Sequence, residues 1–285
     1  MAMQPGCYSG YPEAEYHASE GLSVSRLKRH RKAALLSTVE QDEETRDQKL
    51  GTLIHCVALE PDSFAKRFVI NDDNRNSNAF KAVKAKADAD GKEVVKQQDY
   101  DNARRIRDAI MAHPEAGRIL APGPSLLVEQ SFYWVDPATG ILCRGRADAI
   151  RLDWRAIGDL KSTEDASAEG FARSCTKYLY DWQQAYYQEG IEASCGWMPE
   201  AFFFIAVEKK PPFLVKPWVI HPDDVDRAYD EVCEARAHYR RCLDAGHFPG
   251  LGNDVGTLRI GFRTPANYIE PSPEAAPETV RLIAA

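Results

Sequence analysis

The strongest constraint on this fold is a pair of strand-like runs at residues 141–163, ILCRGRADAIRLDWRAIGDLKST. The runs cover 141–152 and 156–162, and a short Asp-Trp-Arg turn at 153–155 joins them, which predicts a β-hairpin. Such a hairpin normally carries apolar residues on its buried face. Here charged residues interrupt both runs, so the segment predicts a sheet with a polar site built into it.

The charged side chains of the hairpin have a defined geometry, because side chains alternate between the two faces of a strand. Asp159 and Lys161 share one face, and Arg144, Arg146 and Asp148 share one face of the neighbouring strand. Asp148 and Asp159 can therefore converge across the pair, with Lys161 one step further along. Burying two carboxylates and an ammonium without a function would be costly. Paired oxygen ligands suit Mg²⁺, and an adjacent lysine can hold or deprotonate an attacking water.

Composition sets the class of protein but does not select a partner. The chain has 285 residues, 44% of them hydrophobic and 28% charged, as in ordinary globular proteins with ample core. Its net charge of −7 does not favour nucleic acid, although a local basic channel matters more than the total. The N-terminal residues lack the pattern of a signal peptide, and no apolar run is long enough to span a membrane. We therefore expect a cytoplasmic protein without membrane contact.

The seven cysteines are odd in number and include no C-x-x-C pair. This pattern argues against a disulfide framework and against a zinc site, and it predicts reduced thiols. The C-terminal cysteines also lack the close spacing that holds an iron–sulfur cluster.

Two segments are strongly basic. The first is a predicted helix at 23–36, capped by Ser23 or Ser25, and the second is a predicted helix at 79–89. Both can be solvated faces, or both can contact DNA phosphates. The candidate phosphate contacts are Arg26, Lys28, Arg29, Arg31, Lys32, Lys81 and Lys84.

The remaining pattern predicts a mixed α/β fold, in which a central mixed β-sheet is flanked by helices. Further helices are expected at 51–60, 96–112, 166–175, 182–195 and 225–245, and further strands at 126–135, 201–207 and 214–220. We expect a single domain at 21–250, an irregular N-terminal arm at 1–20 and a loosely attached C-terminal tail at 251–285.

Several motifs together resemble the RecB-type branch of the PD-(D/E)xK nucleases. They are Gly51-Thr52-x-x-His55, Gly145-x-x-Asp148, Asp159-Leu160-Lys161-Ser162-Thr163 and Gln184-x-x-Tyr187, and they occur in the order seen in that branch. Asp-x-Lys alone is a weak signal. The longer runs, including GTLIHCVALEP at 51–61, are similar to RecE-type exonucleases, relatives of lambda exonuclease. The resemblance covers roughly residues 10–250.

The resemblance implies a metal site for Mg²⁺, with Mn²⁺ able to substitute and with one or two ions. Asp148, Asp159 and the main-chain carbonyl of Leu160 would coordinate the ion. Glu129 would act through a water or a second ion, and His55 would lie beside the metals, although a histidine in an apolar helix is usually a core residue.

The resemblance also assigns the remaining site residues. Lys161 would position and activate the water, either as a base with a lowered pKa or by orientation alone. Gln184 and Tyr187 would hold the scissile phosphate or brace Lys161, unless they are ordinary helix residues. Arg144 and Arg146 are either phosphate clamps or counter-charges for the acidic cluster.

The activity implied is a 5′ to 3′ exonuclease on double-stranded DNA ends, releasing mononucleotides and leaving a 3′ overhang for recombination. The family also implies a homo-oligomeric ring of three or four subunits and a single-strand annealing protein as partner. Two alternatives stay open: a structure-specific or CRISPR-associated-type endonuclease on the same fold, and a non-catalytic DNA-end-binding scaffold. The second is disfavoured because a scaffold has no need for four costly charges at Glu129, Asp148, Asp159 and Lys161.

Overall fold

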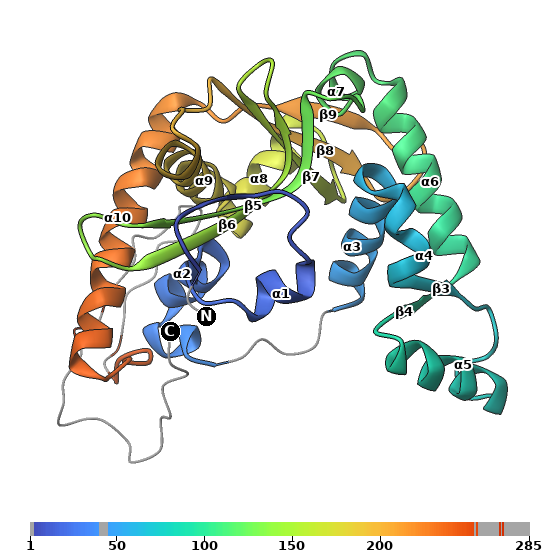
Figure 1. The fold of residues 1–285 in the computed structure, drawn as a ribbon, viewed down its shortest axis with the longest axis horizontal. Coiled ribbons are helices and arrows are strands. Elements are labelled where there is room, and N and C mark those ends of the chain that lie inside the picture. The colour runs from blue at the N-terminus through green and yellow to red at the C-terminus, as the bar shows by residue number, and fades with distance from the viewer. Residues whose placement is uncertain (1–2, 40–44, 254, 256–267, 269, 271–285) are drawn as a thin grey trace.

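A mixed β-sheet forms the centre of the molecule (Figure 1). The computed structural model describes residues 3–39, 45–253, 255, 268 and 270. In the main sheet the strand order is β1-β5-β6-β7-β8-β9, and β2 pairs with β6 beside this path. The pairs β7–β8 and β2–β6 are parallel and the others antiparallel. The strands are β1 (Gly6–Tyr8), β2 (Leu22–Ser23), β5 (Leu126–Val135), β6 (Leu142–Arg151), β7 (Ala156–Thr163), β8 (Ala201–Glu208) and β9 (Val215–Trp218).

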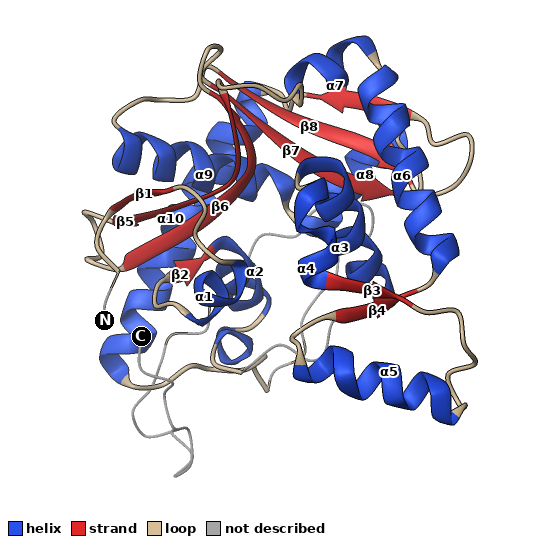
Figure 2. Ribbon diagram, turned by 45° about the vertical axis from the view of Figure 1, so that its right-hand side comes forward, coloured by secondary structure: helices blue, strands red, loops and turns tan. Residues whose placement is uncertain are grey.

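Helices cover both faces of this sheet, as Figure 2 shows. One face packs against α3 (Arg46–Leu59), α6 (Gln97–Ala112) and α7 (Pro114–Ile119). The other packs against α2 (Val24–Lys32), α8 (Ala168–Tyr178), α9 (Tyr180–Cys195) and α10 (Pro222–Ala245). The expected fold class, a central mixed sheet flanked by helices, is confirmed.

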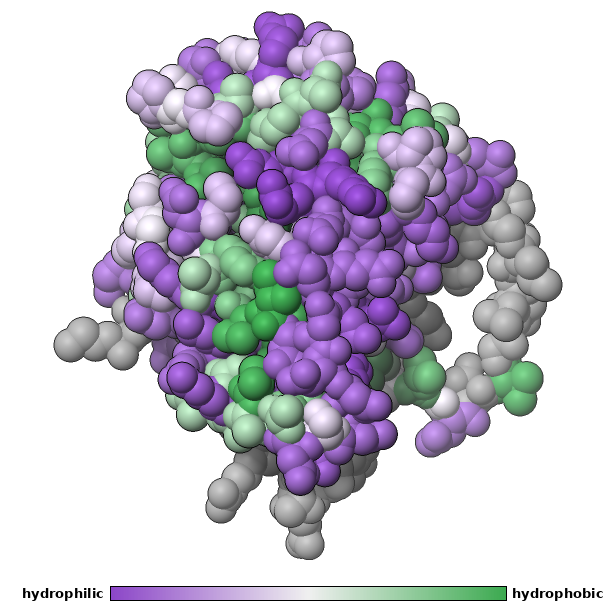
Figure 3. Space-filling model, turned by 90° about the vertical axis from the view of Figure 1, so that its right-hand side faces the viewer, coloured by the Kyte–Doolittle hydropathy of each residue, from purple (hydrophilic) through white to green (hydrophobic). Residues whose placement is uncertain are grey.

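Smaller elements complete the chain. A separate two-stranded parallel sheet pairs β3 (Phe68–Ile70) with β4 (Glu93–Val95). The helices α1 (Glu13–Ala18), α4 (Phe64–Arg67) and α5 (Asn78–Ala89) and the 3₁₀ turns η1 (Ala34–Ser37) and η2 (Pro61–Ser63) lie at the periphery. Figure 3 views the side that carries α5 and α6, and this face is mostly hydrophilic. The amphipathic α6 buries Ala103, Ile106 and Ile110 beneath it.

The alternation of side chains along β8 shows how one sheet serves two cores. Phe202 and Phe204 pack with α9 and α10, while Ile205 and Val207 pack with α3 and α6. On the neighbouring β7 the apolar Leu160 belongs to the α3 side. A carboxylate at an adjacent position of β7 is thereby directed into the opposite layer.

Local chemistry explains where the helices that carry the site begin and end. Ser23 caps α2 by accepting a hydrogen bond from the Arg26 N–H, 3.3 Å away. Thr45 and Gln48 form a capping box at the start of α3, and Pro61 follows its end. The long α10 begins with Pro222 at its first position and ends at Gly246, whose positive φ of 63° suits glycine.

The structure differs from the expected elements mainly near the N-terminus. The arm at 1–20 was expected to be irregular, yet it contains β1 and α1. The helix expected over 23–36 ends at Lys32, because Ala33 is extended and a 3₁₀ turn follows. The strands β1 to β4 have two or three residues each, too few to show a period of two. The tail at 251–285 lies almost entirely outside the described residues.

The expectation of reduced cysteines throughout is wrong for one pair. Cys7 on β1 and Cys195 at the end of α9 form a disulfide, with Cα atoms 6.1 Å apart. These residues are 188 positions apart, so no local spacing could indicate the pairing. The remaining described thiols are free. None of the helices in the described part of the chain combines the length and hydropathy of a membrane span.

Candidate active site

Asp148 lies where the β6–β7 ladder stops. The two strands pair only from Ala149 opposite Gly158 to Arg151 opposite Ala156. Beyond that point a side chain replaces the ladder, because Asp148 Oδ2 accepts a hydrogen bond of 2.8 Å from the Leu160 N–H. This bond fixes the first predicted carboxylate beside the Asp-Leu-Lys segment.

Glu129 approaches the same place from β5. The β5–β6 register would set it directly opposite Asp148, but the pairing is interrupted there, and Glu129 has a positive φ of 49°. Non-glycine residues in this region store strain and cluster at functional sites. The Arg146 guanidinium donates a 2.7 Å hydrogen bond to Glu129 Oε2 and also bonds the Tyr11 carbonyl and Ser131 Oγ.

His55 reaches the carboxylates from α3, which covers the face of the sheet opposite to α9. Its Nδ1 lies 3.5 Å from Asp148 Oδ2, and its Nε2 lies 2.9 Å from the carbonyl oxygen of Leu160. One ligand atom each from His55, Glu129 and Asp148 lie within 4.8 Å of one another. These three side chains could hold a metal ion, and Leu160 offers its carbonyl at the same point.

Asp159 is fully buried and faces α9 rather than this triad. The amide of Gln183 on α9 donates a 2.6 Å hydrogen bond to Asp159 Oδ1. Asp159 Oδ2 forms an ion pair with the Lys161 ammonium. Apart from this ion pair, the oxygen accepts no hydrogen bond in the described part of the chain. A buried carboxylate oxygen of this kind is open to an additional ligand.

The electrostatics of the site depend on burial and on two neighbouring carboxylates. Burial and the nearby Asp159 raise the pKa of Asp148 to about 7, against smaller opposing effects of His55 and Lys161. Burial lowers the pKa of Lys161, but Asp159 and Asp148 outweigh it and raise the pKa above the usual lysine value. Lys161 is therefore an ammonium at neutral pH, which favours orientation over general-base action.

A second lysine, Lys28 on α2, faces the same region. The Lys161 ammonium lies 5.0 Å from the centroid of the Tyr180 ring, and the Lys28 ammonium lies 5.8 Å from it. Burial and repulsion by Lys161 lower the pKa of Lys28 to about 7, although Asp159 and Asp181 oppose this. Lys28, predicted as one of several surface phosphate contacts, thus lies near the same tyrosine ring as the predicted catalytic lysine.

The carboxylates of Asp148 and Glu129 line a cavity of about 790 Å³. Its wall includes Asp148, Glu129, His55 and Tyr187, and α2 contributes Arg26 and Arg29. A second cavity of about 590 Å³ lies between α3, α5 and the segment after β8. Its basic lining residues are Arg46, Lys49, Arg75, Lys84, Lys92, Lys96, Lys209 and Lys210.

The other predicted DNA contacts are distributed differently. Arg144 is buried, and its guanidinium bonds the carbonyls of Tyr16, His17 and Ser19 at the end of α1. This contact is neither of the two expected roles, because the side chain is used to anchor the N-terminal arm. Arg146 acts as the counter-charge to Glu129. Arg31 lies over the Trp182 ring, 5.7 Å from its centroid, and Lys32 and Lys81 are exposed.

The expected site residue Gln184 and its neighbour Gln183 differ in their contacts. Gln184 is buried, and its Oε1 has no hydrogen-bond partner among the described residues, whereas Gln183 holds Asp159. Adjacent helix residues point about 100° apart, so the two cannot exchange roles. Gln183 and Tyr187 are four residues apart on one helix face, and this spacing was the available signal. Tyr180 gave no signal, because ring contacts with lysines are purely tertiary.

The donor set fits a hard divalent cation. It consists of carboxylate oxygens, one main-chain carbonyl and one imidazole, and oxygen ligands of this kind suit Mg²⁺. The Asp159 carboxylate, which already pairs with Lys161, and the triad around Asp148 are the places for such an ion.

Comparisons with known proteins agree with this reading. A crystal structure titled "Putative exonuclease" from Eubacterium rectale matches with a TM-score of 0.60 and 15% sequence identity, over 88% of this chain and 94% of that chain. At this identity the match shows a common fold. A search of the curated proteins found no match. The family model described as "PDDEXK-like domain of unknown function (DUF3799)" matches residues 23–259. The chain therefore belongs to this PDDEXK-like family, within the PD-(D/E)xK nuclease superfamily.

Proposed function

We propose that this protein is a Mg²⁺-dependent exonuclease that degrades one strand of duplex DNA from its 5′ end. The observation that carries the proposal is the grouping of Asp148, Glu129 and His55 where the β6–β7 pairing ends, with the Asp159–Lys161 ion pair on the adjoining segment of β7. The products would be mononucleotides and a 3′ single-stranded overhang. The direction and the products rest on the resemblance to RecE-type exonucleases.

The chain's own residues have separable roles in this reaction. Asp148, Asp159, Glu129, His55 and the Leu160 carbonyl would hold the cation, and a bound cation supplies charge stabilisation and an acidified water. The Lys161 ammonium, paired with Asp159, is placed to orient the attacking water or a phosphate oxygen. Gln183 keeps the Asp159 carboxylate in position by bonding its other oxygen.

Helix α2 supplies the contacts for the scissile strand. Lys28 lies near the Tyr180 ring, as Lys161 does, and Arg26 and Arg29 line the cavity that Asp148 and Glu129 also line. The duplex ahead of the cut would follow the second cavity, whose lining has eight basic and five acidic residues, so its net charge is positive.

A ring of three or four copies would keep this acidic protein on its substrate. With a net charge of −7, a single copy is repelled by DNA at long range. We also propose a single-strand annealing protein as the partner that receives the 3′ overhang, on the basis of the resemblance alone.

Digestion of end-labelled duplex DNA tests the proposed activity. Linear duplex labelled at the 5′ or 3′ terminus and covalently closed circles are incubated with Mg²⁺, Mn²⁺ or EDTA. We expect early release of 5′-labelled mononucleotide with either metal, and intact circles. Asp159→Asn should abolish release, while Asp153→Asn, an exposed carboxylate in the β6–β7 turn, should retain it.

The outcomes separate the alternative functions. Cleavage of closed circles would identify an endonuclease and reject the exonuclease. End binding without release, equal in wild type and Asp159→Asn, would identify a scaffold. Early loss of the 3′ label would overturn the direction and leave the nuclease.

A further inference from the structure

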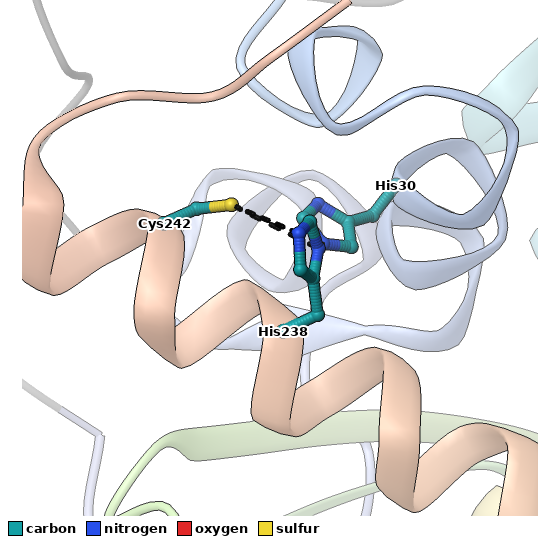
Figure 4. Close-up of side chains that lie close together, drawn as sticks. All are labelled: His30, His238 and Cys242. Carbon is teal, nitrogen blue, oxygen red and sulfur yellow. Dashed lines mark hydrogen bonds between the residues drawn. The ribbon is translucent and has the colours of Figure 1, made fainter. Parts of the chain in front are cut away.

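A second cluster of ligand-type side chains joins α2 to α10, apart from the carboxylates. It consists of His30 on α2 and of His238 and Cys242 on α10 (Figure 4). All three are buried, with exposed fractions of 1%, 0% and 0%. One ligand atom from each lies within 4.8 Å of the others. Two imidazoles and a thiol are an unusual set to place together in a core built of apolar residues.

The arrangement follows from the helices. His238 and Cys242 are one turn apart on α10, so both side chains face α2. His30 Nε2 lies 2.8 Å from His238 Nδ1, and Cys242 Sγ lies 3.8 Å from His238 Nδ1. Tetrahedral Zn²⁺ separates its nitrogen and sulfur ligands by about 3.3 to 3.6 Å. The His30–His238 and His238–Cys242 separations therefore need to change by roughly half an ångström or less to match an ion's ligands.

Ser37 determines which ring nitrogen of His30 carries the proton. Its hydroxyl donates to the Ala34 carbonyl at 2.6 Å, so the same oxygen can only accept from His30 Nδ1, 3.2 Å away. His30 thus carries its proton on Nδ1, and its Nε2 presents a lone pair toward His238 and Cys242. A hydrogen bond that fixes the ring of a ligating histidine in this way is typical of metal sites.

Aromatic rings shield the cluster from water. The centroids of Tyr239 and Phe248 lie 5.1 and 6.1 Å from that of His30, and Tyr268 lies 4.7 Å from His238. The Tyr268 hydroxyl is buried without a hydrogen-bond partner among the residues that the structure describes. The surroundings are therefore dry and still contain a polar group whose partner is not accounted for.

We propose that His30, His238 and Cys242 supply three ligands of a site for a borderline-soft divalent metal ion, Zn²⁺ in the first place. A thiolate with two imidazoles selects zinc-class ions, whereas the carboxylate site selects hard ions such as Mg²⁺. On binding, the Cys242 thiol gives its proton to solvent. The proton between the two histidines moves to the other nitrogen of His238, and the ion takes its place.

The proposed ion would fix α2 relative to α10. Lys28 precedes His30 by two residues on α2 and lies against Tyr180. A metal at His30 would therefore hold the helix that presents Lys28 and Arg26 to the active site. The competing explanation is a histidine pair that satisfies its own hydrogen bonds, with Cys242 as packing.

Co²⁺ is the probe that separates these explanations, because thiolate ligation gives a near-ultraviolet charge-transfer absorption that carboxylates and water do not give. Metal-free protein with the Cys7–Cys195 disulfide intact is titrated with Co²⁺ in the presence of excess Mg²⁺. We expect this absorption to saturate at one equivalent and to disappear when Zn²⁺ is added. Zinc should also be found at one equivalent in protein purified without chelator.

Matched variants locate the ligand. Cys242→Ser should lose the charge-transfer absorption, and Cys233→Ser, on the same helix, should keep it. His30→Gln, which can still bond Ser37, should weaken Co²⁺ binding at least ~10-fold. No thiolate absorption in folded wild type would overturn the proposal, as would an absorption unchanged in Cys242→Ser. If Cys242→Ser fails to fold, unchanged Co²⁺ affinity in His30→Gln would overturn it instead.

Discussion

At the scale of single residues, the pKa of Asp148 is set by influences that act in opposite directions. Asp148 is largely buried, it faces a second carboxylate, and it accepts a hydrogen bond from the Leu160 N–H. Burial and Asp159 dominate, so the side chain holds a proton up to pH about 7, well above the usual range for aspartate. A cation bound at this place must displace that proton.

Metal binding should therefore depend on pH. Below pH 7 the apparent affinity for Mg²⁺ should rise up to ~10-fold per pH unit, and the dependence should level off above it. Calorimetric titration in buffers of different ionisation enthalpy should detect about one proton released per ion at pH 6. Asp148→Asn should bind weakly and release no proton. Equal affinity at pH 6 and pH 8 would contradict the raised pKa.

The same carboxylate gives a stability effect of defined sign. Its folded pKa is raised, so the metal-free folded state binds more protons than the unfolded chain between pH about 4 and 7. Its contribution to the free energy of unfolding is present at low pH and is lost as the pH rises through this window.

Gln183 and Gln184 provide a second test at this scale. Gln183→Met removes the hydrogen bond to Asp159 and should lower kcat about 10- to 100-fold, as loss of a group that orients a metal ligand does. Gln184→Met replaces a buried amide whose oxygen has no hydrogen-bond partner among the described residues, and it should change kcat less than about threefold. Steady-state kinetics with matched thermal melts would decide. A larger loss in Gln184→Met would restore the original assignment.

Much of the site could be predicted from sequence, because strand alternation and the Asp-x-Lys spacing are local. Asp148, Glu129 and His55 lie close enough together to hold one ion, and Asp159 pairs with Lys161 on the neighbouring segment of β7. Which face of α9 meets the site is harder to predict. Gln183 and Gln184 are adjacent glutamines in the sequence, yet only Gln183 contacts Asp159. The use of Arg144 to anchor α1 depends on an element of six residues that has no signal of its own.

At the scale of elements, α2 is the helix whose role changes most between sequence and structure. Its cluster of basic residues is divided by the fold: Lys28 lies against Tyr180, Arg29 lines the cavity, and Lys32 is exposed. The helical period shows which basic residues share a face of α2, but it does not show which face lies against the site. The long strands were predictable from their apolar runs, whereas β1 to β4 form only because neighbouring elements pair with them.

Replacing Lys28 tests this division. Lys28→Met should weaken duplex DNA binding about 3- to 10-fold and reduce the salt slope by about one charge. Because its pKa is lowered to about 7, wild-type affinity should fall between pH 6.5 and 8.5, and the variant should show a flatter profile. Fluorescence anisotropy without added metal measures both effects. Lys32→Met, on the exposed side of the same helix, is the matched control, and an equal effect there would contradict a specific role for Lys28.

At the scale of the whole molecule, the sign of the charge is the central problem. The chain carries 43 acidic and 36 basic residues, yet the proposed substrate is a polyanion. Basic residues gather in the cavity beside α5, and α2 adds others at the active site. A single copy held only by these contacts would dissociate readily at physiological salt, because phosphate contacts weaken steeply as salt rises.

A closed ring would keep the protein on DNA because it encircles the duplex, even if each phosphate contact is weak. If the protein encircles DNA, raising the salt should slow the first encounter but should hardly shorten the stretch digested in one encounter. Addition of excess unlabelled linear duplex after the reaction starts measures that length. Sedimentation should give a mass of three or four 31.9 kDa chains under the same conditions. A monomer whose digestion stops as soon as competitor is added would rule out the ring, and retention would then have to come from the basic cavity alone.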